Sequence, residues 1–168
     1  PISALKTVDE AGVAHFKKHA LESERIAGNV LRRLKFDNDT IRKVTRLVRY
    51  HDLRMPATAK SVRRAMNQIG EELFPYYMEV RRADVLAQSM YQREEKIENL
   101  DQIEELYRQI VEDGDCVSLK DLAVTGRDLI ASGMKPGKKI GEKLEELLKL
   151  VIEDPKLNTK EELLKRLN

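Results

Sequence analysis

Four side chains of the kinds that bind divalent metal ions are spread over three segments of the chain that carry helical periodicity. They are His19, the adjacent pair His51 and Asp52, and Asp84. Neutral imidazole nitrogens and carboxylate oxygens together suit a small divalent metal, and four such ligands leave coordination positions open for water and a phosphate oxygen. The residue types therefore indicate a site for a divalent metal ion with open coordination positions.

The neighbouring apolar residues predict that these side chains point toward a core. His51 continues the apolar face of its segment, His19 falls within the stripe of the first segment, and Asp84 lies in the middle of the stripe of the fourth. A buried carboxylate needs a counter-charge, so we expect Asp84 to bind a metal ion or an arginine such as Arg81. Each residue alone would fit a hydrogen-bonded core position, whereas four converging residues favour the metal ion.

The elements that must position these residues are predicted to be helices. Apolar residues recur at spacings of three and four along most of the chain, and no stretch alternates long enough to predict a strand. We therefore expect an all-α fold. Asn38 or Asp39 is expected to cap the second helix, and Thr159 with Glu162 to form a capping box in the last. The predicted helices span residues 11–34, 38–52, 59–73, 76–95, 99–113, 119–131, 138–153 and 159–167.

The strongest turn signal is the sequence DGD at residues 113–115, where we expect a boundary between two parts of the chain. The predicted organisation is a multi-helix bundle over residues 1–96, a connecting acidic helix over 97–115 and a small helical tail over 116–168. Pro75 is expected to separate the third helix from the fourth.

Length and composition narrow the class of protein. The 168 residues, 41% hydrophobic and 36% charged, fit one compact domain or a domain with a small appendage. No apolar run reaches about 18 residues and no secretion signal is present, so we expect a cytoplasmic protein without a membrane partner. Cys116 cannot form an internal disulfide and lacks an activating basic neighbour. A sequence that begins at Pro1 rather than methionine is expected of a fragment or a processed product.

Charge is distributed unevenly along the chain. Residues 1–96 carry 19 basic and 13 acidic side chains, a net charge of +6, whereas residues 97–168 carry 12 and 16, a net charge of −4. The basic part contains paired and helically spaced arginines, which can neutralise the phosphates of a nucleic acid. A solvated helix face explains the same pattern. The basic side chains concerned are Arg32, Arg33, Arg42, Lys43, Arg46, Arg49, Arg63, Arg64, Arg81 and Arg82.

The order of His19, His51-Asp52 and Asp84 resembles the HD superfamily of metal-dependent phosphohydrolases. More specifically, HALESERIAGNVLRRLKFDNDTIRKVTRLVRYHD and RRADVLAQS resemble the HD domain in the C-terminal half of bacterial CCA-adding tRNA nucleotidyltransferases. The segment LAVTGRDLIASGMKPGKKIGEKLEELLKLVIEDPKLNTKEELLKRL is similar to the terminal part of those enzymes, which contacts tRNA. The resemblance covers nearly the whole chain and implies an HD-type bundle followed by an RNA-binding tail.

Two elements of that family have no counterpart here. The nucleotidyltransferase head carries a Gly-Ser or Gly-Gly turn followed by paired metal-binding aspartates, and the incoming nucleotide is read by a Glu-Asp-x-x-Arg element. Neither pattern is found in this sequence. The resemblance therefore implies the C-terminal part of such an enzyme, without the head that adds nucleotides.

The tail contains a candidate RNA-binding turn. Gly137 precedes a predicted helix that opens with Lys138, Lys139 and Gly141. Free backbone amides at a helix N-terminus, two lysines and a glycine that permits close approach form a plausible phosphate cradle. The alternative is that Gly137 only turns the chain and that Gly141 lets two helices pack.

These observations leave two hypotheses and a weaker third. In the first, residues 1–96 form a phosphohydrolase acting on phosphomonoesters or 2′,3′-cyclic phosphates. Its divalent ion, Mg²⁺, Mn²⁺, Ni²⁺ or Zn²⁺, is held by His19, His51, Asp52 and Asp84, with Asp52 and Arg54 as catalytic residues. In the second, the chain is a non-catalytic tRNA-binding module whose HD site is structural or vestigial. A hydrolase of a nucleotide second messenger would share the site but would not explain the tail.

Overall fold

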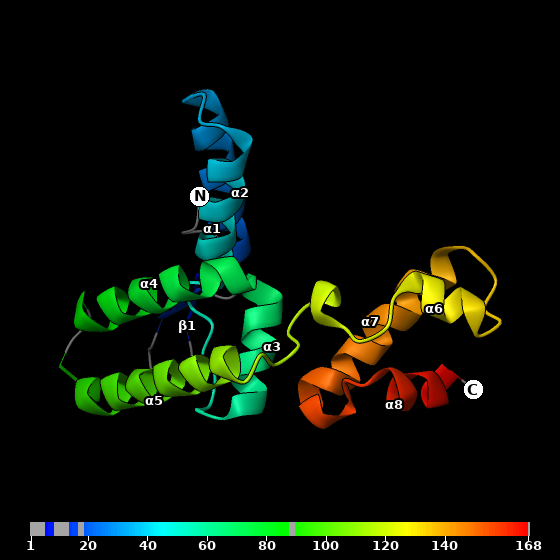
Figure 1. Cartoon of the computed structure of the whole chain (residues 1–168). Helices are drawn as coiled ribbons and strands as arrows, with labels where there is room; N and C mark the ends of the chain where they lie inside the picture. Colours follow the sequence, from blue (N-terminus) through cyan, green and yellow to red (C-terminus); the bar gives the residue numbers. More distant parts are fainter. Residues whose placement is uncertain (1–5, 9–13, 17–18, 88–89, 168) are drawn as a thin grey trace. The chain divides into compact units, whose positions relative to one another are not determined.

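A computed structural model of the chain, which describes residues 6–8, 14–16, 19–87 and 90–167, is built almost entirely of helices (Figure 1). The predicted all-α class is confirmed. The α-helices are α1 (His19–Arg33), α2 (Asn38–Tyr50), α3 (Ala59–Ile69), α4 (Phe74–Ala87), α5 (Arg93–Glu112), α6 (Gly126–Ala131), α7 (Lys138–Glu153) and α8 (Lys160–Leu164). The described residues also include four short 3-10 helices: η2 (Glu71–Leu73), η3 (Leu119–Asp121), η4 (Pro155–Leu157) and η5 (Lys165–Leu167).

A short antiparallel hairpin precedes the first helix. Strand β1 (Lys6–Val8) pairs with β2 (Ala14–Phe16), with Lys6 opposite Phe16. The prediction that the first helix begins at residue 11 is therefore wrong, since residues 14–16 are extended and α1 begins at His19. The strand residues include β-branched and aromatic types, which favour extended backbone, but runs of three residues are too short to give an alternating pattern.

Polar side chains fix where the helices begin. Asp37, rather than the predicted Asn38 or Asp39, caps α2, because its carboxylate accepts a hydrogen bond from the Thr40 amide at 2.9 Å. Thr159 caps α8 as predicted, since its hydroxyl accepts from the Glu162 amide at 3.2 Å. The Glu162 carboxylate pairs with Lys165 and Arg166 instead of completing the predicted capping box. Such caps satisfy amides that lack an acceptor in the first turn.

The chain divides into two compact units, residues 1–54 with 72–93 and residues 55–71 with 94–168. The first unit holds α1, α2 and α4. Helices α1 and α2 run side by side (Figure 1), and α2 also contacts α4. Gly28 of α1 is buried, and a Cβ there would lie 3.5 Å from the Thr45 methyl group on α2. The division into parts that end at residues 96 and 115 remains a prediction from the sequence.

The second unit contains the core of the tail. Helix α7 contacts α3 and α6, and its apolar face supplies much of that core. Gly126 allows the contact between α6 and α7, since a Cβ there would lie 3.1 Å from Ile140 Cγ2. The predicted turn at residues 113–115 is present, with Gly114 at φ +67° after the end of α5. The buried tail residues are Cys116, Leu122, Val124, Leu129, Leu147, Leu148, Val151, Ile152 and Leu163.

None of the helices in the described ranges is both long enough and apolar enough to cross a membrane.

Candidate functional site

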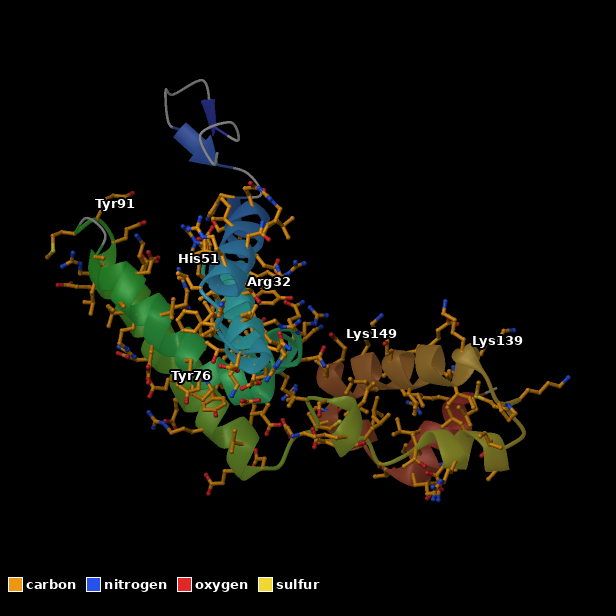
Figure 2. The ribbon with its side chains drawn as sticks, turned by 90° about the horizontal axis from the view of Figure 1, so that it is seen from above. Arg32, His51, Tyr76, Tyr91, Lys139 and Lys149 are labelled. Atoms are coloured by element: carbon orange, nitrogen blue, oxygen red, sulfur yellow. The ribbon has the colours of Figure 1, made fainter. Side chains whose placement is uncertain are left out.

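Two of the four predicted metal ligands come together in the first unit. His19 is the first residue of α1, and His51 directly follows α2. Their Nε2 atoms are 3.2 Å apart, and the two rings meet edge to face with centroids 5.1 Å apart. Figure 2 shows His51 beside the paired helices. The antiparallel packing of α1 and α2 thus brings the beginning of one helix to the end of the other.

A backbone contact sets the tautomer of His51. Its Nδ1 lies 2.7 Å from the Val48 carbonyl oxygen, which can only accept, so Nδ1 carries the hydrogen. In the neutral ring, Nε2 of His51 then presents a lone pair toward His19 Nε2. Two imidazole nitrogens on one tetrahedral ion with bonds of about 2.0–2.1 Å would be roughly 3.3 Å apart. The observed separation of 3.2 Å between the two Nε2 atoms is close to that spacing, and the Val48 contact orients His51 in the way that is common for metal-bound histidines.

Asp84 pairs with Arg81, which is the second of the two partners expected for it. Its carboxylate accepts a hydrogen bond from Arg81 Nη1 at 3.1 Å, and its side chain is 39% exposed. Val80 of the same helix is also exposed. The buried face of α4 instead contains Arg81 with four apolar residues: Phe74, Tyr77, Met78 and Val85. The prediction that Asp84 lies on the core face is wrong, because Arg81 takes that position and Asp84 lies at its rim.

Tyr77 is a residue of this site that the sequence interpretation did not assign to it, and Arg81, expected only as a partner of Asp84, has a second contact there. Arg81 is 9% exposed, and its Nη1 also donates to the His51 carbonyl oxygen at 3.2 Å, so one guanidinium bridges His51 and Asp84. Tyr77 donates its hydroxyl to the Leu53 carbonyl at 2.6 Å. Burial raises the pKa of Tyr77 to about 12, with Arg81 opposing the shift and Asp52 adding to it. Residues 74, 77, 78, 81 and 85 follow helical spacing, but α4 also has apolar residues on its other sides, so spacing alone does not reveal this face.

Asp52 and Arg54 form a weak surface pair. Arg54 Nε lies 3.9 Å from Asp52 Oδ1, and the side chains are 77% and 47% exposed. Within residues 19–87 and 90–167, no group of three or more His, Cys, Asp or Glu side chains is close enough together to hold a metal ion. Of the predicted ligand set, the structure thus brings together His19 and His51 and leaves Asp52 and Asp84 in contact with arginines.

The predicted RNA-binding turn lies at the beginning of α7. Gly137 caps the helix with φ +147°, a conformation that residues with a side chain rarely adopt. Lys138 and Lys139 are exposed, and Figure 2 shows Lys139 and Lys149 extending from α7. A Cβ on Gly141 would meet no atom within 4 Å, so Gly141 is not needed for helix packing. Gly126 has that role instead.

Several of the basic residues make ion pairs within the protein, at the surface as well as in the core. Arg63 is buried and donates to Asp115 Oδ2 and to the Ile152 carbonyl, both at 2.9 Å. Arg64 pairs with Glu153, and Arg42 with Asp39 and Glu72. These guanidiniums are used within the protein. Arg46 and Arg49 lie over the Tyr50 ring at the end of α2.

Comparison with models of known protein families matches residues 9–167 to the family described as "tRNA nucleotidyltransferase domain 2 putative". Neither the curated proteins nor the solved structures contain a match.

Proposed function

The chain belongs to the tRNA nucleotidyltransferase domain 2 family, and from this premise we propose that it binds tRNA as the C-terminal part of such an enzyme. The family match over residues 9–167 is the observation that carries the proposal. A separate nucleotidyltransferase head would add the nucleotides, while this chain holds the body of the tRNA.

The turn before α7 supplies the contact. The amides of Lys138 and Lys139 lie in the first turn of a 16-residue helix, where backbone donors have no intrahelical acceptor and the helix dipole favours an anion. Both lysine side chains are exposed, and the absence of a side chain at Gly141 leaves the helix backbone open beside them. A phosphate of the RNA backbone would accept from the amides and pair with the lysines.

Titration of a fluorescent tRNA transcript at several KCl concentrations tests this proposal. Changing Lys138 and Lys139 together to Gln should weaken tRNA binding. The slope of the logarithm of the affinity against the logarithm of the KCl concentration should become shallower by roughly 2, about one for each lost phosphate contact. Lys120→Gln is the matched control, because Lys120 is exposed and pairs with Glu71 at 2.8 Å. A parent chain that binds no tRNA, or a double variant that binds like the control, would overturn the proposal.

The His19–His51 pair favours a second candidate function, a metal-dependent phosphohydrolase. Their Nε2 atoms would hold a divalent ion, which supplies the Lewis acidity that polarises a phosphoryl oxygen and activates water. Asp84 and Asp52 would have to turn from their arginines to complete the ligand set. Arg81 would position His51 through its carbonyl and keep a positive charge beside a bound phosphate.

Two measurements decide between the tRNA-binding module and the phosphohydrolase. They are the metal content and the turnover of a 2′,3′-cyclic nucleotide, determined for the parent chain and for the variants His51→Gln and Asp84→Ala. Stoichiometric metal and turnover in the parent, both lost in the variants, would support the hydrolase. A folded parent that binds tRNA but neither metal nor cyclic nucleotide would overturn the hydrolase and leave the tRNA-binding module.

A further inference from the structure

The paired helices α1 and α2 bury few of their side chains. They are 15 and 13 residues long, and each contributes one buried residue, Gly28 in α1 and Ile41 in α2. Helix α3, with 11 residues, contributes five. Helices in proteins are stabilised mainly by packing of an amphipathic face. Much of the apolar surface of α1 and α2 is therefore left open.

The open surface of α1 contains an apolar ridge. Ile26, Val30 and Leu34 are spaced by four residues, and they are 36%, 38% and 60% exposed. Ile26 and Val30 each lie two residues from Gly28, about 160° around the helix axis, so they point away from the side that contacts α2. Phe36, 48% exposed, follows in the turn after the helix. These four residues, here called the α1 ridge, form a contiguous apolar set of the kind that marks an interaction surface.

The charges beside the α1 ridge are positive. Residues 29–36 contain Arg32, Arg33 and Lys35 and no acidic residue. Arg33 and Lys35 are exposed, and the carboxylates of residues 19–51 are engaged elsewhere in the described structure. Glu22 binds Arg25, Glu24 binds Arg49, Asp37 caps Thr40, and Asp39 binds Arg42 and Lys43. The ridge thus combines exposed apolar side chains with cations that no carboxylate of the helix pair neutralises.

These two features together select one kind of partner. Side chains spaced by four residues form a ridge that packs into the groove of another helix, and an amphipathic helix offers apolar anchors at matching spacing. RNA would pair with Arg33 and Lys35 but would leave the aliphatic side chains uncovered. A symmetric second copy would place the same cations against each other, which is unfavourable. An acidic helix complements both the apolar side chains and the charge.

We infer that the α1 ridge is the docking surface for an acidic amphipathic helix of a partner protein. Apolar side chains of that helix would cover Ile26, Val30 and Leu34, and its carboxylates would pair with Arg33 and Lys35. The inference does not depend on tRNA binding, because the ridge lies in the first unit and the turn before α7 lies in the second.

The test uses the full chain and a fluorescent synthetic peptide of about three heptads, with Leu at spacings of three and four and Glu at the bordering positions. A second peptide carries Lys in place of Glu. The parent chain should bind the acidic peptide about tenfold more tightly than the basic one, and Leu34→Gln should weaken binding of the acidic peptide by about tenfold.

Two further variants separate the contributions of charge and apolar contact. Changing Arg33 and Lys35 together to Gln should weaken binding of the acidic peptide and make its affinity less sensitive to KCl. Leu150→Gln is the matched control, because Leu150 is an apolar residue of α7 with 37% exposure, and it should bind the peptide as the parent does. Thermal melts of each variant show whether the fold is retained.

Other occupants of the ridge give different results. Equal binding of the two peptides, or parental binding in Leu34→Gln, would overturn the inference. Self-association of the parent in sedimentation velocity that is lost in Leu34→Gln would assign the ridge to a second copy and overturn it as well. Weaker tRNA binding in Leu34→Gln would assign the ridge to RNA. A parent that binds the acidic peptide but no tRNA would overturn only the proposed function.

Discussion

Arg63 on α3 and Asp115 after α5 form a buried ion pair with Nη1 and Oδ2 2.9 Å apart. The same guanidinium donates from Nε to the Ile152 carbonyl near the end of α7, also at 2.9 Å. The two side chains are only 9% and 16% exposed. One arginine thus holds three segments of the second unit together, and it is therefore used in folding rather than in binding phosphate.

Removing one partner of this pair should be costly. Arg63→Met leaves the Asp115 carboxylate without its counter-charge and should lower the free energy of unfolding by about 3 kcal/mol, as is typical when a buried pair is broken. Arg64→Met is the control, because Arg64 pairs with Glu153 at the surface with 54% exposure and should cost less than about 1 kcal/mol. Denaturant unfolding measures both, and equal effects would contradict the assignment.

A double variant refines the same prediction. Changing Asp115 to Leu in the Arg63→Met background removes the unpaired charge as well as its former partner. The double variant should therefore be more stable than the sum of the two single effects predicts. Strict additivity would show that the two side chains do not interact in solution.

Gly141→Ala should change stability and RNA binding in opposite directions. Gly141 lies inside α7 with open space where a Cβ would be, so alanine should raise the free energy of unfolding by about 0.5–1 kcal/mol. The added methyl group should weaken tRNA binding if the phosphate approaches the helix backbone here. The gain in stability excludes unfolding as the cause. Unchanged affinity would remove Gly141 from the phosphate contact.

Asp128 should make the stability of the tail sensitive to acid. Lys160 first, and then the Thr125 hydroxyl and amide, hold the pKa of the Asp128 carboxyl well below its ordinary value of 3.8. A depressed pKa contributes stability that is fully present above the unfolded pKa and is lost as the pH falls through the folded pKa.

The difference in stability between the parent and Asp128→Asn should consequently be full at pH 6 and shrink below about pH 4. Denaturant unfolding at a series of pH values measures this difference. A difference that stays constant down to pH 2 would show that the carboxylate charge is not the source of the stabilisation.

The comparison between α7 and α4 shows what sequence patterns can predict. Helix α7 has the predicted bounds, because apolar residues on a single face follow a glycine that ends the preceding turn. Helix α4 carries apolar residues on several sides, including Tyr76, Met78 and Val80, so its buried face could not be chosen from periodicity. The structure selects the face that contains Arg81, whose long hydrocarbon stem can be buried while its charge is paired.

The candidate site was also predictable only in part. His19 and His51 lie together because two amphipathic helices joined by a short turn pack antiparallel. The pairing of individual cations could not be predicted, since Arg63, Arg42 and Arg46 look alike in the sequence. Only the folded chain shows that the first is buried, the second is paired with carboxylates and the third lies over Tyr50.

Hydrogen–deuterium exchange of the chain with and without a tRNA transcript tests the central claim most directly. The amides at the beginning of α7 have no intrahelical acceptor and should exchange rapidly in the free protein. Bound tRNA should slow exchange across residues 133–142, and in Lys138→Gln/Lys139→Gln that protection should be lost. Binding of tRNA with unchanged exchange in residues 133–142 would contradict the account.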